Sequence, residues 1–126
     1  MGLSPFGIVL RHLREKQRFS LRDLAEFAKI DHAYIYRLET GQKESPSEDA
    51  INRLIKVLKP SKRDAEMLFF LARNPDTDPE LIEYALNNQT VQFDEFASAA
   101  GVRFRGSARP SPKILIDRIR KVIKEK

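Results

Sequence analysis

The chain has 126 residues, of which 33% are charged and 41% are hydrophobic, a composition typical of a folded globular protein rather than a disordered segment. The absence of cysteine excludes disulfides, thiolate metal sites and cysteine nucleophiles. With only two histidines as well, we expect no metal and no cofactor. No apolar stretch is long enough to span a membrane and basic residues interrupt the early apolar run, so we expect a cytoplasmic protein without a secretory signal.

The net charge of +5 is unevenly distributed along the chain. Residues 76–101 contain six acidic residues and neither lysine nor arginine, whereas residues 102–126 contain nine basic and two acidic residues. Residues 1–45 and 46–75 each carry a small basic excess. An excess of positive charge suits a polyanionic partner, but on charge alone a solvated charged surface is an equally good interpretation.

Two helices are predicted at the start of the chain. Residues 6–16 carry apolar side chains at helical spacing between charged ones. Ser20, with Asp23 three residues later, is typical of a capping box at the start of a second helix. The apolar stripe of this second helix consists of Leu21, Leu24, Ala25 and Ala28.

A third, short helix is predicted over residues 32–39. Asp31 is a suitable N-cap for it, and Gly41 stands just past its end, where a left-handed residue is often needed. Ile35 and Leu38 are expected to face inward.

Serine caps and prolines delimit two further helices. Ser47 is expected to begin the fourth helix and Pro60 to end it, and Ser61 with Asp64 forms a second capping pair that begins the fifth. The string Asn-Pro-Asp at 74–76 ends the fifth helix. The residues of the fourth helix expected to face the core are Ile51, Leu54, Ile55 and Leu58. The apolar residues of the fifth helix are Ala65, Leu68, Phe69, Leu71 and Ala72.

The remainder of the chain is also predicted to be helical. Asp78 before Pro79 is a favoured start for one helix, and a second ends at Gly101. Residues 102–111 form an arginine-rich connector, and a terminal helix follows over residues 112–125. No pattern typical of a strand is present.

We therefore expect an all-α fold with two parts. A five-helix domain covers residues 1–75, and a short helical C-terminal region covers residues 76–126, with the boundary where the composition changes.

Residues 20–41 carry the most informative motif, which reads SLRDLAEFAKIDHAYIYRLETG. It resembles the helix-turn-helix of the Xre family, the Cro and phage-repressor class, and the resemblance extends from residue 6 to about residue 59. Leu21 stands where the family usually has a polar residue and Ala28 where it usually has glycine. The matching positions are Arg14, Leu24, Ala25, Ile30, Ile35, Leu38, Glu39 and Gly41.

The resemblance implies that the third helix enters the major groove of double-stranded DNA. Arg37 could pair with the O6 and N7 atoms of guanine or contact a phosphate, and the two alternatives are about equally favoured. The aromatic side chains could instead cover the domain's own core, and each polar one could simply be solvated. The predicted base-facing residues are His32, Ala33, Tyr36 and Arg37, and the phosphate candidates are Ser20, Arg22, Tyr34, Gln42 and Lys43.

The resemblance also implies a structural salt bridge between Arg14 in the first helix and Glu39 at the end of the third. The alternative is that both side chains are solvated, as most surface charges are.

The terminal helix is the candidate for dimerisation, because a family regulator typically reads an inverted repeat as a homodimer. Its apolar stripe could pack on the acidic segment 76–101, on a second chain, or on both. The residues of this stripe are Leu115, Ile116, Ile119, Val122 and Ile123.

A bacterial or phage transcription regulator is the predicted function, in particular a repressor that binds an inverted-repeat operator. Two alternatives stay open: an antitoxin or metallopeptidase-controlled repressor whose C-terminal half binds a protein partner, with residues 103–106 as a site of cleavage, and an adaptor that does not bind DNA. The chain has no nucleotide-binding loop, metal-ligand cluster or nucleophile motif, so we do not expect an enzyme.

Overall fold

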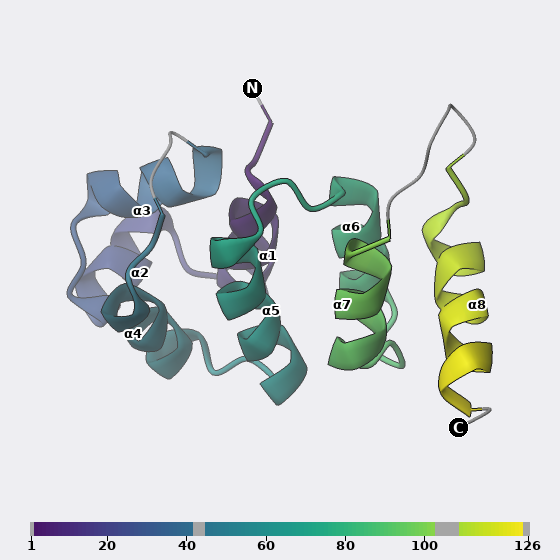
Figure 1. Cartoon of the computed structure of the whole chain (residues 1–126). Helices are drawn as coiled ribbons and strands as arrows, with labels where there is room; N and C mark the ends of the chain where they lie inside the picture. The colour runs from purple at the N-terminus through teal and green to yellow at the C-terminus, as the bar shows by residue number, and fades with distance from the viewer. Residues whose placement is uncertain (1, 42–44, 103–108, 125–126) are drawn as a thin grey trace. The chain divides into compact units, whose positions relative to one another are not determined.

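The computed structural model describes residues 2–41, 45–102 and 109–124 (Figure 1). These ranges contain eight α-helices and no strand, so the predicted all-α fold is confirmed. The chain divides into two compact units, Met1–Asp76 and Thr77–Lys126, with the division one residue beyond the predicted boundary.

The first unit contains five helices, each begun by a side chain that accepts a hydrogen bond from a backbone N–H of the first turn. Four of these N-caps were predicted; the fifth is Ser4, which with Pro5 starts the first helix one residue earlier than expected. The N-caps are Ser4, Ser20, Asp31, Ser47 and Ser61. The helices are α1 (Pro5–Lys16), α2 (Leu21–Ala28), α3 (His32–Thr40), α4 (Glu48–Leu58) and α5 (Lys62–Arg73).

The turn between α2 and α3 has its left-handed residue at an unexpected place. Ala28, at the position where the family has glycine, is the last helical residue, and Lys29 after it adopts φ 55°. The backbone N–H of Lys29 is still bonded to the end of α2, so the turn forms without glycine. Gly41 after α3 has φ 77°, as predicted for this position.

The apolar stripes of the five helices meet in one core. Helix α1 contacts α3 and α5, and α2 contacts α3 and α4. Ile55, which was predicted to face the core, is only half-buried, and so are Ala65, Phe69 and Ala72 of α5. The large buried side chains are Phe6, Val9, Leu10, Leu13, Leu24, Ile35, Leu38, Ile51, Leu54, Leu58, Met67, Leu68 and Leu71.

The second unit contains α6 (Pro79–Asn87), α7 (Phe93–Ala100) and α8 (Pro112–Lys124), and all three helices contact one another. Leu115 and Ile116 of α8 lie in its core, beside α6 and α7 residues such as Ile82 and Phe96. These two side chains therefore pack within the chain and are not available to a partner, which corrects part of the predicted dimerisation stripe. Ile119 is half-buried, and Val122 and Ile123 are exposed.

An ion pair fixes the far end of α8. Arg120 donates from Nε to Glu95 Oε2 at 3.0 Å and from Nη2 to the backbone oxygen of Thr90 at 3.1 Å. Glu95 lies in the first turn of α7, so α8 and α7 run in opposite directions at this contact. The hydrogen bond to Glu95 raises the pKa of Arg120 above its ordinary value.

None of the helices in the described ranges combines the length and the hydrophobicity needed to cross a membrane. The predicted cleavage segment, residues 103–106, lies outside the described residues.

Candidate nucleic-acid interface

Helix α3 has a buried face and an exposed face, and both were predicted from its sequence. Ile35 and Leu38 are 0% and 2% exposed, respectively, and hold the helix against α1 and α2. His32, Ala33 and Tyr36 are exposed. These three side chains lie on the side of α3 that a DNA major groove would meet if the helix docked there.

Arg37 and Tyr34 form a pair at the edge of this exposed face. The guanidinium carbon of Arg37 lies 5.9 Å from the centre of the Tyr34 ring, within range of a cation–π contact. Both residues are half-buried. Tyr34 therefore contacts the arginine, and neither side chain is fully buried in the core.

The N-terminus of α2 carries two of the predicted phosphate contacts. Ser20 and Arg22 are exposed there. Ser20 Oγ accepts a hydrogen bond from Asp23 N at 3.0 Å, and Asp23 Oδ2 accepts one from Ser20 N at 2.9 Å, which completes the predicted capping box. The carboxylate of Asp31 likewise caps α3 by accepting a hydrogen bond from Tyr34 N.

Two further predicted phosphate contacts, Gln42 and Lys43, lie outside the described residues. The other seven predicted DNA contacts lie within the described residues, at the start of α2 or on α3: Ser20, Arg22, His32, Ala33, Tyr34, Tyr36 and Arg37.

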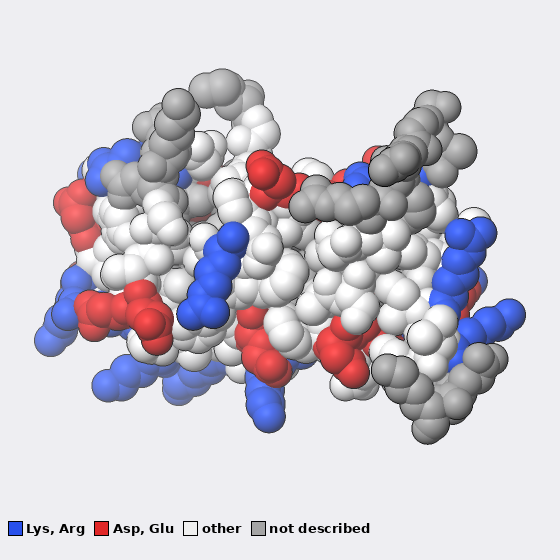
Figure 2. Space-filling view, in the orientation of Figure 1, with Lys and Arg blue, Asp and Glu red and all other residues white. Residues whose placement is uncertain are grey.

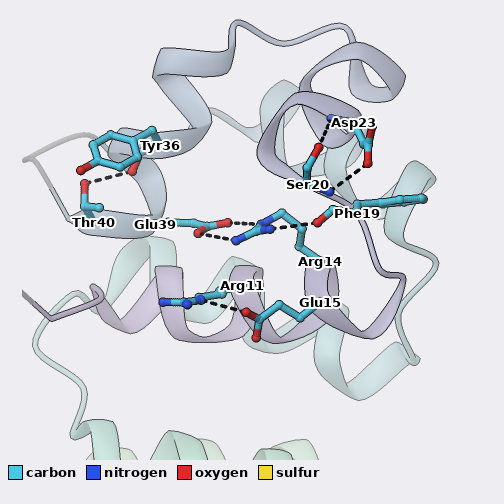
Figure 3. A network of polar contacts seen from close by, with 9 residues as sticks. All are labelled: Arg11, Arg14, Glu15, Phe19, Ser20, Asp23, Tyr36, Glu39 and Thr40. Carbon is cyan, nitrogen blue, oxygen red and sulfur yellow. Dashed lines mark hydrogen bonds and ion pairs between the residues drawn. The ribbon is translucent and has the colours of Figure 1, made fainter.

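Arg14 and Glu39 form the ion pair that the sequence predicted (Figure 3). Arg14 donates from Nε to Glu39 Oε2 at 2.7 Å and from Nη2 to Oε1 at 3.2 Å. Its Nη1 donates to the backbone oxygen of Phe19 at 2.9 Å. The side chains are only 13% and 5% exposed, and the hydrogen bond to Glu39 raises the pKa of Arg14 above its ordinary value. One guanidinium thus joins α1, the end of α3 and the loop before α2.

Ser4 and Gly7 join α1 to the same end of α3, and sequence reasoning missed both. Ser4 donates from its backbone N to Glu39 O at 3.0 Å and from Oγ to Leu38 O at 2.9 Å. A Cβ on Gly7 would overlap Glu39 O and lie 2.6 Å from its carbonyl carbon. The two helices touch backbone to backbone here, which only glycine permits. The Ser-Pro start of α1 and a glycine inside a helix were the available signals.

Two side-chain contacts fix the position of α4. Arg53 donates to the backbone oxygen of Lys29 at 3.1 Å, in the turn between α2 and α3. Gln17 donates to the backbone oxygen of Leu58 at 2.8 Å. Neither contact is visible in the sequence, because each joins residues more than twenty positions apart.

The face of the molecule drawn in Figure 2 carries mixed charges and is not uniformly basic. In the view of Figure 2, acidic and basic side chains are interspersed and separated by uncharged surface. Within the described residues, no group of three or more histidine or acidic side chains is placed to hold a metal ion.

Comparisons with known proteins agree with this geometry. Residues 5–66, which span α1 to α4 and the start of α5, match a family model described as a helix-turn-helix domain. The N-terminal part of the chain is therefore a helix-turn-helix domain, while its assignment to the Xre type stays a prediction.

One curated relative is similar to this domain. It is the uncharacterized HTH-type transcriptional regulator RghRB of Bacillus subtilis (strain 168), which is 37% identical over 57 residues. The match covers 45% of this chain and 41% of the relative, so the chain spans less than half the length of the relative that it matches.

Proposed function

We propose that the protein is a transcription regulator of the Xre type that binds double-stranded DNA through α3. The observation that supports this most strongly is the exposed face of α3 (His32, Ala33 and Tyr36) on a helix whose other face is fixed to α1 and α2. A rigid, exposed helix of this kind fits the major groove. The matching family and the name of the relative point to the same function.

The proposed binding mode is a homodimer on an inverted repeat, and the proposed effect is repression. One α3 helix per protomer would read one half-site, with the half-site centres about 34 Å apart, one turn of DNA. Such a protein acts by binding, and no catalytic step is part of the proposal.

Selection of bound sequences from random duplex DNA tests this function. We expect enrichment of an inverted repeat with half-sites about one helical turn apart. Affinity for the enriched site should fall steeply with salt, because phosphate contacts release counterions. Two results together would instead favour the adaptor function. The selection would enrich no sequence, and the affinity for duplex DNA would be no higher than that of a variant in which the exposed α3 residues His32 and Tyr36 are replaced by alanine.

Arg37 allows base reading to be separated from phosphate contact. If it reads a guanine, Arg37→Ala should cost roughly 1–3 kcal/mol of binding free energy on the enriched site and relax the preference at one base pair. Arg37→Lys should not restore that preference, since lysine lacks the planar pair of donors. Fluorescence anisotropy on the enriched site and on single-base variants of it measures both effects.

The matched comparison is Arg22→Ala, at an exposed position of α2. If Arg22 contacts a phosphate, Arg22→Ala should weaken binding to every duplex alike and lower the salt slope by about one unit. Equal losses on specific and random DNA for Arg37→Ala would make Arg37 a phosphate contact as well. Melting temperatures of both variants show whether the domain stays folded.

A further inference from the structure

Helix α8 presents an exposed face that combines apolar and basic side chains. Ile114 and Val122 are 47% and 61% exposed, and Arg118 and Lys121 are exposed between them. Residues four, seven and eight positions apart share one side of a helix, so these four side chains form a single surface. This surface, the α8 face, differs from the stripe that the sequence predicted, because Leu115 and Ile116 are turned into the core.

The two cations of the α8 face have no partner among the described residues. Lys113 pairs with Asp117 at 3.1 Å, and Arg120 pairs with Glu95 at 3.0 Å. In the part of the chain that the structure describes, neither Arg118 nor Lys121 makes an ion pair. Two positive charges, flanked by two apolar side chains, are thus exposed and unpaired within the described ranges.

Helix α6 of the same unit carries the opposite charge. Glu80 and Glu83 are exposed on it, and within the described ranges neither carboxylate makes an ion pair. They are three residues apart, as Arg118 and Lys121 are. Side chains at this spacing on a helix lie about 5–6 Å apart at Cβ, so both pairs could form simultaneously between two helices.

We propose that the α8 face binds the α6 helix of a second copy of this chain. A symmetric dimer uses the same contact twice, so Arg118 and Lys121 of each protomer meet Glu80 and Glu83 of the other. Each copy carries both halves of the contact, which favours a second copy over a different partner. The inference rests on the proposed function, because it supplies the dimer that an inverted repeat requires.

Charge reversal on the full-length chain tests the contact in the absence of DNA. We expect the wild type to sediment as a reversible dimer that weakens as salt is added, since exposed ion pairs are screened. Glu80→Lys with Glu83→Lys should weaken dimerisation at least about tenfold, and so should Arg118→Glu with Lys121→Glu, because each of four exposed pairs changes the equilibrium by a factor of about two. Combining all four substitutions should restore the dimer to within about threefold.

The restored dimer distinguishes this contact from a general effect of charge. Lys56→Glu with Lys62→Glu, at exposed positions of the first unit, lowers the net charge by the same amount as Arg118→Glu with Lys121→Glu and should leave the dimer unchanged. The proposal is overturned by a monomeric wild type, by unchanged dimerisation of both double variants, or by a fourfold variant as weak as they are. Circular dichroism of each variant verifies folding.

Replacing the apolar residues of the α8 face provides a second test that leaves its charges unchanged. Ile114→Ser and Val122→Ser remove exposed apolar surface and should each weaken the dimer several-fold without lowering the melting temperature. Deleting α8 is a poorer test, because it would also remove Leu115 and Ile116 from the core.

Dimerisation and DNA binding are measured separately, so the two proposals can fail independently. A dimer that follows the charge reversals but binds no DNA leaves the contact in place and removes the regulator function. A monomer that binds a single half-site overturns the α8–α6 contact and keeps DNA binding through α3.

Discussion

Gly7→Ala should destabilise the first unit by about 3 kcal/mol or more, even though alanine is the better helix former. The added Cβ would overlap the carbonyl group of Glu39, which is backbone and has no rotamer to change. Helix α1 would have to move away from α3 and break the hydrogen bonds from Ser4 to Leu38 and Glu39. Thermal unfolding followed by circular dichroism should show a melting temperature lower by about 10 °C or more.

Two other glycines serve as controls for this substitution. A Cβ on Gly2 meets nothing within 4 Å, and one on Gly101 meets its nearest atoms at 3.7 Å, which is ordinary contact. Gly2→Ala and Gly101→Ala should therefore change stability by no more than about 1 kcal/mol. If the melting temperature of Gly7→Ala equals those of the two control variants, the close approach of α1 to Glu39 is not a constraint on the fold.

Arg14→Ala should cost roughly 3–5 kcal/mol of unfolding free energy. It leaves the carboxylate of Glu39 buried without its bidentate partner, and it removes the donor to the Phe19 carbonyl. The loss should appear without DNA in chemical denaturation. DNA affinity should fall as well, because Glu39 lies at the end of α3 and its ion pair helps to hold that helix.

The partner substitution makes this prediction more specific. In a double-mutant cycle, Arg14→Met with Glu39→Met should be less destabilising than Arg14→Met alone, since no unpaired buried charge remains. Arg11→Ala removes an exposed ion pair on the same helix, in which Arg11 and Glu15 are 48% and 58% exposed, and should cost no more than about 1 kcal/mol. Additive losses at Arg14 and Glu39 would mean that the two side chains act independently.

Much of the helix-turn-helix domain was predictable because its signals are local. An N-cap such as Ser20 and its partner Asp23 are three residues apart, so the start of α2 can be identified without knowledge of the rest of the fold. The exposed face of α3 follows from the spacing of Ile35 and Leu38, which a single helix period determines. The Arg14–Glu39 pair was predicted through the family resemblance, since 25 residues separate the two.

The contacts that hold α3 in place could not be predicted from local patterns. Gly7 looks like a weak point in a helix until the backbone of Glu39 is found against it. The left-handed residue of the turn is Lys29, one position after the expected glycine position, and Arg53 of α4 donates a hydrogen bond to its backbone oxygen. The close approach at Gly7 and the left-handed conformation of Lys29 both depend on which helices pack together, and the spacing of residues in the sequence does not determine this.

Helix α8 shows the same division most clearly. Its apolar period was evident, and the amphipathic helix formed over Pro112–Lys124. Which part of the stripe is covered was decided by its neighbours. Arg120 meets the first turn of α7, so the residues that follow it extend past the start of that helix. Val122 and Ile123 therefore stay exposed while Leu115 and Ile116 are buried, because a helix period specifies a face and only a packed neighbour determines how much of that face is removed from water.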